Sequence, residues 1–276
     1  MSSCENCPRK NDCKTKESCG IENNPYNNVK KVVGVMSGKG GVGKSTISVL
    51  LAKSLQKKGY KVGVMDADIT GPSIPRLLNV KDKKAQKSEL GITPVEDKNG
   101  IKVMSLNLLL QDEQQPVIWR GPLIAGMVKS FWTDVLWGEL DYLIIDMPPG
   151  TGDVALTVMQ SIPINGIVIV SVPQDLVSMI VAKAVNMARK LKIDVIGVVE
   201  NMSYVLCPDC KKKIQIFNSE NTEGFLKEMD LKLLGELPMS RDIANLSRED
   251  AVVEDKALQE TLERITEKII LFVNHD

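Results

Sequence analysis

The amino-acid sequence predicts an α/β fold in three layers, with a mostly parallel central sheet and helices on both of its faces. Almost purely apolar segments of strand length alternate with segments of helical periodicity along most of the chain. Strands that are apolar on both faces are typical of parallel sheets, because helices cover each side of such a sheet. The 276 residues, of which 43% are hydrophobic, suffice for one large domain with at most a small appendage.

Six segments have the apolar character of buried strands. They are residues 31–36, 62–66, 142–146, 166–171, 195–200 and 231–237. Two further extended pieces are expected between residues 92 and 106, on either side of a turn-like Asp-Lys-Asn-Gly sequence. Helical periodicity lies between these strands. The expected helices are residues 45–58, before a stop at Gly59, and residues 122–132, 154–160, 176–191 and 257–273.

The first 28 residues differ in composition from the rest of the chain. They hold four of the six cysteines, many polar side chains and almost no aliphatic ones. Such a segment cannot bury enough apolar surface to fold by itself, so it either stays flexible or is organised by a metal. We therefore expect a cysteine-rich arm over residues 1–28 and one folded domain over residues 29–276.

A glycine-rich loop follows the first predicted strand. Residues 38–46 read Gly-Lys-Gly-Gly-Val-Gly-Lys-Ser-Thr and fit the P-loop pattern G-x-x-x-x-G-K-S/T. Successive backbone N–H groups of such a loop curl around a phosphate, and the N-terminus of the following helix adds a favourable dipole. The alternative is a chance glycine-rich turn, which would not require a strand before it and a helix after it. The expected nucleotide-binding residues are Gly38, Lys39, Gly40, Gly41, Val42, Gly43, Lys44, Ser45 and Thr46.

Two lysines of this loop are candidate catalytic residues with different roles. Lys44 stands at the position of the P-loop lysine that reaches the β- and γ-phosphates. Lys39 has no role in an ordinary P-loop, and a cation there can point toward a nucleotide held by a second subunit. The loop therefore predicts a nucleotide and Mg²⁺ as cofactors, and Lys39 indicates a homodimer.

Carboxylates at the ends of two predicted strands are candidates for the rest of the catalytic site. Asp146 ends an apolar strand, where P-loop enzymes place an aspartate that holds Mg²⁺ through water. The loop hydroxyl, here Ser45, then ligates the ion directly. Asp66 and Asp68 follow another strand, at the edge where open α/β sheets carry their site residues. We expect Asp68 to orient the attacking water and Asp66 to stand in the outer shell of Mg²⁺. Turn-forming or strand-end aspartates remain the alternative.

Composition and charge exclude several other classes of function. His275 is the only histidine, which excludes a Ser-His-Asp triad and a histidine-rich metal site within one chain. The 35 basic and 35 acidic side chains balance, so no nucleic-acid partner is expected. No apolar stretch approaches the roughly 20 residues of a membrane span, and the N-terminus lacks the apolar core of a signal peptide. We expect a cytoplasmic location without membrane contact.

Two sets of cysteines are candidate metal ligands. Cys207-x2-Cys210 supplies two thiolates, whereas a tetrahedral metal site or a cubane cluster needs four, so two subunits related by a two-fold axis would complete the set. On spacing alone, a zinc knuckle, a redox dithiol and an inert pair remain alternatives. The arm contains four thiols in one polypeptide, for which zinc and an iron–sulfur cluster both remain open. These are Cys4, Cys7, Cys13 and Cys19.

The order of the motifs resembles a known family. The motifs are the P-loop at 38–46, DADITGPS at 66–73, WRGP at 119–122, DMPPGTGD at 146–153, ENMS at 200–203 and C-x2-C at 207–210. The set resembles the Mrp/ApbC iron–sulfur cluster carrier ATPases, a branch of the deviant P-loop class that includes MinD, ParA and the nitrogenase iron protein. The resemblance covers about residues 30–273. The cysteine arm is similar to that of the eukaryotic-type scaffold relatives in this family.

The resemblance implies an ATP-dependent homodimer that binds a [4Fe–4S] cluster between its subunits, hydrolyses ATP and passes the cluster to apo-proteins. It implies that Lys39 contacts the nucleotide of the partner subunit and that Asn201 binds the adenine edge. From the sequence alone, the Asn-Met-Ser segment at residues 201–203 is expected to be a turn at the end of a strand, with Asn201 as a turn residue. It also implies that Cys207 and Cys210 hold the bridging cluster with their symmetry mates. The alternatives are a positioning ATPase of the MinD or ParA type, an electron-donating iron–sulfur reductase component and a zinc-stabilised NTPase.

Overall fold

The computed structural model describes most of the chain apart from its N-terminus and several short internal segments. The described residues are 24–69, 71–110, 121–176, 179–207, 209–210, 212–215, 222–248, 253 and 255–275. The predicted arm lies outside them except for residues 24–28, as do its four cysteines and the Trp-Arg pair at 119–120. The side-chain amides of Asn24 and Asn27 donate to the backbone oxygens of Thr133 and Val135, at 3.0 and 2.8 Å, and so hold the start of the described residues against the domain.

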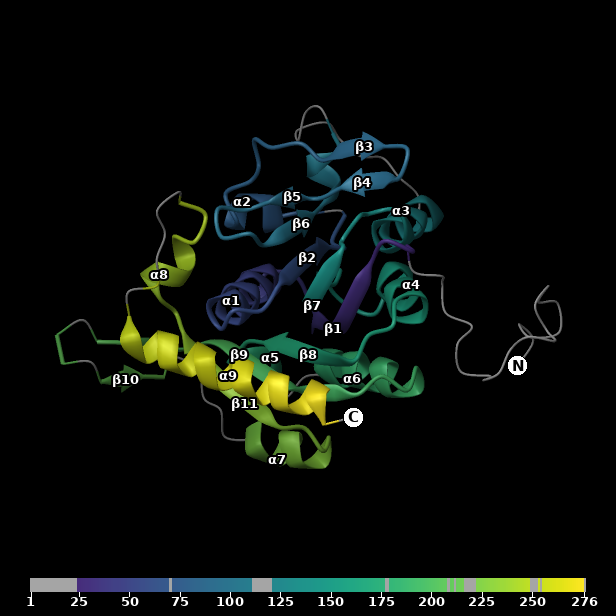
Figure 1. The fold of residues 1–276 in the computed structure, drawn as a ribbon. Coiled ribbons are helices and arrows are strands. Elements are labelled where there is room, and N and C mark those ends of the chain that lie inside the picture. The colour runs from purple at the N-terminus through teal and green to yellow at the C-terminus, as the bar shows by residue number, and fades with distance from the viewer. Residues whose placement is uncertain are drawn as a thin grey trace.

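A mostly parallel sheet forms the centre of the molecule (Figure 1). Its strands follow the order β10-β9-β8-β1-β7-β2-β6-β5, and β11 also pairs with β9. The pairs β5–β6 and β9–β10 are antiparallel, and the others are parallel. The strands are β1 (Asn28–Ser37), β2 (Val62–Asp66), β5 (Val95–Glu96), β6 (Lys102–Met104), β7 (Glu139–Asp146), β8 (Gly166–Ser171), β9 (Val195–Leu206), β10 (Lys213–Ile214) and β11 (Leu233–Pro238). A separate hairpin joins β3 (Gln86–Ser88) to β4 (Gly91–Thr93).

Helices cover both faces of this sheet. The longer ones are α1 (Lys44–Lys57), α3 (Gly121–Thr133), α4 (Asp153–Ser161), α6 (Met179–Lys190) and α9 (Lys256–Asn274). The shorter ones are α2 (Ile74–Leu77), η1 (Leu106–Leu108), α5 (Pro173–Leu176), α7 (Thr222–Glu228) and α8 (Arg241–Ala244). Among the described helices, none has both the length and the apolar character needed to cross a membrane.

Two hydrophobic cores lie on opposite sides of the sheet. Along β1, Val33 and Val35 belong to the core that includes side chains of α1 and α9. Their neighbours Val32 and Met36 belong to the core that includes side chains of α3, α4 and α6. Successive side chains of a strand point to opposite faces, so a strand that is apolar throughout can supply both cores. The predicted three-layer α/β fold is confirmed.

Most predicted elements match the structure closely, and one prediction is wrong for a local reason. Strands β2 and β8 have the predicted bounds. The helix predicted over residues 176–191 corresponds to α6 (Met179–Lys190), and residues 177–178 before it lie outside the described residues. The turn expected at residues 201–203 is part of β9, which continues to Leu206. Met202 adopts a left-handed backbone conformation there (φ 55°), and the pairing of β9 with β11 shifts register nearby.

Gly197 is a site where the close approach of β9 to β11 can be tested. Its φ is +155°, and an added Cβ would lie 2.4 Å from the backbone oxygen of Lys232. We expect Gly197→Ala to lower the free energy of unfolding by about 2–3 kcal/mol, because the strained backbone and the clash add. Gly224→Ala in α7 is the matched control, since its added Cβ meets nothing within 4 Å. Urea unfolding should show a neutral or small stabilising effect for the control, and an unchanged midpoint for Gly197→Ala would contradict the expectation.

Candidate functional site

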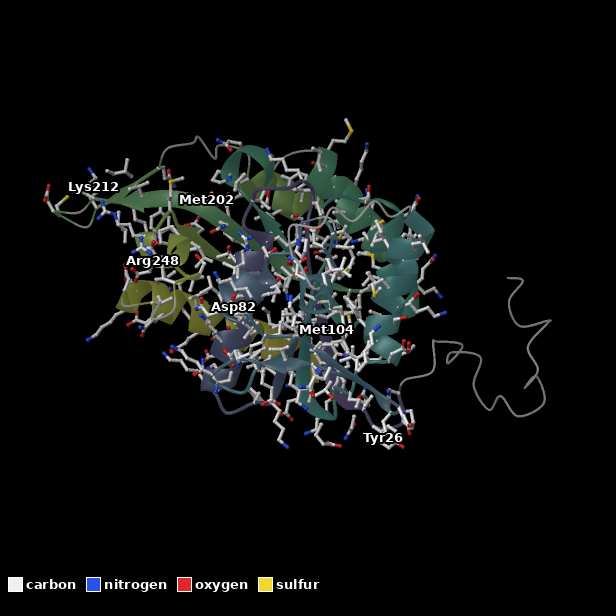
Figure 2. The ribbon with its side chains drawn as sticks, turned by 90° about the horizontal axis from the view of Figure 1, so that it is seen from above. Tyr26, Asp82, Met104, Met202, Lys212 and Arg248 are labelled. Atoms are coloured by element: carbon white, nitrogen blue, oxygen red, sulfur yellow. The ribbon has the colours of Figure 1, made fainter. Side chains whose placement is uncertain are left out.

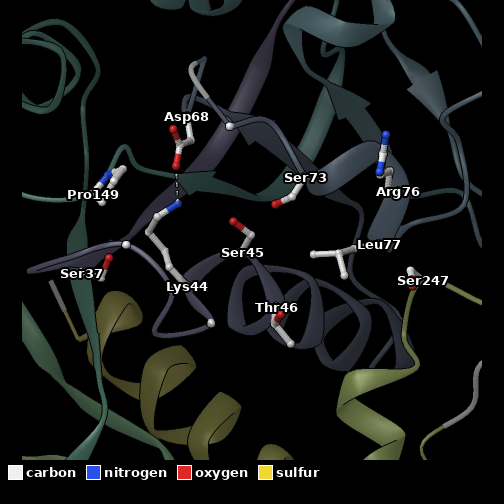
Figure 3. Close-up of a pocket in the computed structure, with 14 residues that line it drawn as sticks. Ser37, Lys44, Ser45, Thr46, Asp68, Ser73, Arg76, Leu77, Pro149 and Ser247 are labelled. Atoms are coloured by element: carbon white, nitrogen blue, oxygen red, sulfur yellow. Dashed lines mark ion pairs between the residues drawn. The ribbon is translucent and has the colours of Figure 1, made fainter. Parts of the chain in front are cut away.

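The P-loop connects β1 to α1 and borders a pocket. Gly41 and Gly43 have φ values of 82° and 85°, which L side chains rarely adopt, and these turns curl the loop around an open space. The pocket has a volume of about 480 Å³. The loop glycines, Lys44 and Ser45 line one side of it, and Arg76, Leu77 and Ser247 line the other (Figure 3). The pocket therefore lies at the N-terminus of α1, where an anion is favoured.

Lys44 lies between two carboxylates at the base of this pocket. Only 6% of its side chain is exposed. Its Nζ lies 2.9 Å from Oδ1 of Asp146. It also lies 3.6 Å from Oδ2 of Asp68, an ion pair that Figure 3 shows. The structure thus brings together three of the predicted site residues, which come from α1, from the end of β7 and from the segment after β2.

Hydroxyl groups hold the buried carboxylates in place. Ser45 Oγ donates to Oδ2 of Asp146 at 2.5 Å, and Ser48 Oγ, one turn further along α1, donates to Oδ1 at 2.8 Å. Asp66 accepts hydrogen bonds from Ser105 Oγ at 3.1 Å and from backbone N–H groups of the segment after β2. Both carboxylates are therefore fixed before any ligand binds.

Burial is the main cause of the pKa shifts of Asp66 and Asp146. It raises the pKa of Asp66 well above the ordinary value of 3.8, and the negative charge of Asp146 raises it further, while Lys44 opposes the shift. Burial also raises the pKa of Asp146, against the hydrogen bonds and charge of its partners. A divalent cation would offset the cost of burying these charges. An all-oxygen set of Ser45, Asp146 and Asp66 has the donor chemistry that Mg²⁺ prefers, so the residues fit the predicted ion.

Asn201 of β9 contacts the backbone of the P-loop. Its Nδ2 donates to the backbone oxygen of Val42 at 2.9 Å, and 1% of the residue is exposed. Its buried Oδ1 has no hydrogen-bond partner within the described part of the chain. An added Cβ on Gly43 would lie 2.3 Å from Nδ2, so the glycine permits this close contact. The structure thus places Asn201 against the loop backbone, and its role at the adenine edge stays a prediction.

The predicted cysteine pair lies in the turn between β9 and β10. Leu206 pairs with Lys213, and the N–H of Cys207 donates to the backbone oxygen of Lys212 at 3.0 Å, which extends the ladder by one rung. Cys207 is half-exposed and Cys210 is exposed. Lys212 marks this hairpin at the periphery of the molecule in Figure 2. We call residues 205–214 the cysteine hairpin.

The cysteine hairpin supplies an incomplete set of metal ligands. Among the described residues, no group of three or more His, Cys, Asp or Glu side chains is arranged to hold a metal ion. The thiols of one hairpin therefore need ligands from elsewhere to complete a tetrahedral site.

Sequence reasoning missed several residues of the nucleotide pocket. Arg76, Ser73 and Ser247 line it, although they were not predicted as site residues. Ser48 could have been found, because it lies four residues after Lys44 and therefore on the same face of α1. Ser247 has no local signal, since only the fold brings it to the pocket.

The glycine loop at the start of α1, beside a buried strand-end carboxylate, places the protein among the P-loop nucleotide-binding proteins. The family model described as NUBPL iron-transfer P-loop NTPase, of the ParA group, matches residues 28–271. The chain belongs to this family.

Curated relatives match nearly the full length of the protein. A protein of Clostridium perfringens named iron-sulfur cluster carrier protein is 49% identical over 259 residues, covering 88% of this chain and 90% of the relative. A protein of Methanocaldococcus jannaschii with the same name is 43% identical over 279 residues, covering 96% of each protein.

Solved structures agree with this family. A nucleotide-binding protein from Archaeoglobus fulgidus in complex with ADP has a TM-score of 0.71 and 43% identity, covering 87% of this chain and 88% of that one. The cell division ATPase MinD of Pyrococcus furiosus has a TM-score of 0.63 at 20% identity, covering 87% of this chain and 98% of its own, and it shows the shared fold alone.

Proposed function

We propose that this protein is an ATP-dependent carrier that binds a [4Fe–4S] cluster between two copies of itself and passes the cluster to apo-proteins. The observation that carries the proposal is the layout of β9 (Val195–Leu206). Asn201 on this strand contacts the P-loop, and Cys207 follows its last residue. One strand therefore joins a nucleotide site to a pair of thiols, of which Cys207 is half-exposed and Cys210 is exposed. The names of the curated relatives support the same function.

The nucleotide site has the groups that phosphoryl transfer to water requires. Lys44 would contact the β- and γ-phosphates, and Ser45 would ligate Mg²⁺ while Asp146 holds the ion through water. Asp68, within 3.6 Å of Lys44, would orient the attacking water. Mg²⁺ supplies positive charge that neutralises the phosphate oxygens in the transition state. Since positioning dominates this chemistry, an ordinary carboxylate suffices beside the water.

A homodimer would complete both sites. Lys39 is exposed on the first half of the P-loop, from which it would reach the nucleotide of a second copy. Beside it, Met179 and Ile180 at the start of α6 are 71% and 42% exposed, and Ile180 lies against Gly38. Exposed apolar side chains next to a functional loop favour contact with another protein surface. ATP binding would then change the subunit contact that also holds the cluster, which would couple nucleotide state to cluster release.

Metal analysis of cysteine variants tests the proposal. After anaerobic reconstitution, we expect the parent protein to hold a bridging cluster of roughly four iron and four sulfide per dimer. The Cys207→Ala/Cys210→Ala variant should lose this amount of iron and sulfide, and it should sediment with less dimer.

A variant of the arm provides the control. It replaces Cys4, Cys7, Cys13 and Cys19 by alanine. This variant should keep the bridging cluster, because its Cys207 and Cys210 remain. A hairpin variant with as much iron as the parent would contradict the proposal, and a colourless parent loaded only with zinc would support a zinc-stabilised NTPase instead.

A further inference from the structure

A second pocket, of about 280 Å³, lies next to the cysteine hairpin. Residues of β9, β10, β11 and α9 form its walls. In Figure 1 these elements gather at the end of the sheet opposite the β3–β4 hairpin. Of the described residues that line this pocket, none also lines the nucleotide pocket, so the two sites are separate.

Three cationic side chains converge on this pocket. Lys213 of β10 lies over the ring of Tyr204, with Nζ 4.2 Å from the ring centroid. Arg264 and Lys268 lie one turn apart on α9, and both line the pocket. A hydrogen bond to Thr261 Oγ1, at 3.1 Å, holds the guanidinium group of Arg264. A ring holds Lys213 and a hydroxyl holds Arg264. Neither partner carries a negative charge, so neither neutralises the cation it holds.

Lys268 also protects the outer strand. Its Nζ donates to the backbone oxygen of Leu234 at 2.8 Å and lies 3.4 Å from that of Leu233. Strand β11 pairs only with β9 within the described sheet, so its other edge would otherwise be open to another strand. A lysine on these carbonyl groups disfavours strand addition as the way a partner binds here, and favours a ligand that is attracted by charge.

The positive charge of the pocket is only partly balanced. Glu236 is the carboxylate that lines it, and its Oε2 lies 4.0 Å from Nζ of Lys213. Of the nearby acidic groups, Asp255 accepts from the first backbone N–H groups of α9, and Glu267 pairs with Lys58 at 2.8 Å. Three cations therefore face one carboxylate among the described lining residues, which favours an anionic ligand.

The position of the pocket indicates what kind of molecule carries this anion. Lys213 pairs with Leu206, whose neighbour in the sequence is Cys207. A ligand at Lys213 is therefore held by the same hairpin that carries the thiols. A cluster can pass between proteins only when the ligands of the acceptor come close to those of the donor. A protein segment anchored in this pocket would hold its backbone next to the exposed cysteines.

We propose that this pocket binds a carboxylate group of an acceptor protein, which docks that protein beside the cysteine pair. The identity of the acceptor as a cluster recipient rests on the proposed function, whereas the carboxylate site does not. Lys213, Arg264 and Lys268 bind the carboxylate, and the ring of Tyr204 holds the ammonium group of Lys213 in position. An acidic side chain carries this chemistry, and so does the free carboxylate at the end of a polypeptide.

Fluorescence anisotropy with labelled peptides tests the site on the full-length protein at low ionic strength. One probe has two glutamates and an amidated C-terminus, a second has a free C-terminal carboxylate and no acidic side chain, and a third is amidated and neutral. At least one of the first two probes should bind, and the third should not. Arg264→Glu and Lys213→Glu should each weaken binding at least about tenfold, because like charges then face the ligand.

Lys87→Glu is the matched control, since this exposed lysine belongs to β3, whose hairpin lies beyond the opposite end of the sheet from the pocket (Figure 1). It should leave peptide binding unchanged, and thermal unfolding checks that all variants are folded. Equal binding of all three peptides would overturn the proposal, as would undiminished affinity in both charge-reversal variants. Displacement of the peptide by an equal concentration of inorganic phosphate, or tighter binding of a single-stranded oligonucleotide, would also overturn it.

The cysteine variant separates this proposal from the proposed function. Cys207→Ala/Cys210→Ala should bind the peptide with parental affinity while it lacks the cluster. A parent protein that binds the peptide but assembles no cluster would leave the carboxylate site standing and remove the carrier function. A parent protein that assembles a cluster but binds neither charged peptide would leave the carrier function standing and remove the carboxylate site.

Discussion

Lys44→Ala is expected to lower the rate of ATP hydrolysis by about 100-fold or more, the usual effect of removing one preorganised charge from a transition state. Lys44 is buried, and its Nζ lies between Asp146 and Asp68 at the base of the phosphate pocket. Without it, these carboxylates would face the phosphates with no ammonium group between them. Phosphate release at saturating ATP and Mg²⁺ measures the effect, and a loss of less than about threefold would contradict this role.

The same variant tests whether Lys39 acts across the dimer. Lys39→Ala alone should also lose hydrolysis, but it should still bind ATP, because its own Lys44 is intact. In an equal mixture of the two inactive variants, a heterodimer contains one complete site: the Lys39→Ala subunit binds ATP and its partner supplies Lys39. Random pairing in a symmetric dimer then restores about a quarter of the parental rate.

Two further observations make the mixture decisive. Each variant mixed with more of itself should stay inactive, so the recovered rate must depend on the ratio of the two proteins. A mixture that remains inactive after the subunits have exchanged would place Lys39 in its own subunit's site or outside catalysis.

Asp146→Asn is expected to stabilise the nucleotide-free protein at neutral pH while it abolishes Mg²⁺-dependent hydrolysis. The pKa values of Asp146 and Asp66 are both raised in the folded state from 3.8. As the pH rises above 3.8, the unfolded polypeptide loses these protons first, so the free energy of unfolding falls until the folded carboxylates ionise. The variant removes one of the two titrations and weakens the repulsion that raises the pKa of Asp66. Its advantage should therefore shrink as the pH is lowered toward 4.

Asp141→Asn provides a control with the opposite sign. A hydrogen bond from Lys30 at 2.7 Å, and another from the backbone N–H of Lys61, lower the pKa of Asp141 from 3.8. This carboxylate stabilises the fold above that pH, and the stabilisation is lost as the pH falls through the lowered folded pKa. Urea titrations in the presence of a chelator should show Asp141→Asn less stable than the parent at neutral pH. If Asp146→Asn is also less stable than the parent at neutral pH, then the two buried carboxylates do not destabilise the folded protein as inferred.

The sequence predicted the sheet well because its strands are continuous apolar runs. Such runs, as in β2 and β8, bury side chains in both cores, so the pattern and the fold agree. The turn expected at residues 201–203 shows the limit of this reasoning. Asn and Ser favour turns locally, but β9 pairs with β8 and β11 up to Glu200 and with β11 and β10 from Tyr204 onward, so the strand continues through them. Strands of two or three residues, such as β10, are too short for a periodic signal.

The features of the candidate site also fall into two groups, local sequence patterns that can be predicted and contacts between distant segments that cannot. The P-loop, Asp146 and the cysteine pair are local patterns, and the sequence predicted each of them. The ion pairs of Lys44 and the hydrogen bond from Ser105 to Asp66 join segments far apart in the sequence. Likewise, the contact of Asn201 with Val42 joins residues 159 positions apart. A single sequence contains no signal for such contacts, because the whole fold must form before they exist.

The position of the cysteine hairpin has a chemical consequence. Beyond Tyr204, β10 is the described strand that pairs with β9, so the thiols stand outside the body of the sheet (Figure 2). Thiolates that are open to an incoming protein are equally open to dioxygen, peroxide and chelators. Cargo bound there would be easy to hand over and easy to destroy by oxidation. This arrangement suits a protein that binds its cluster briefly and passes it on, rather than one that stores it.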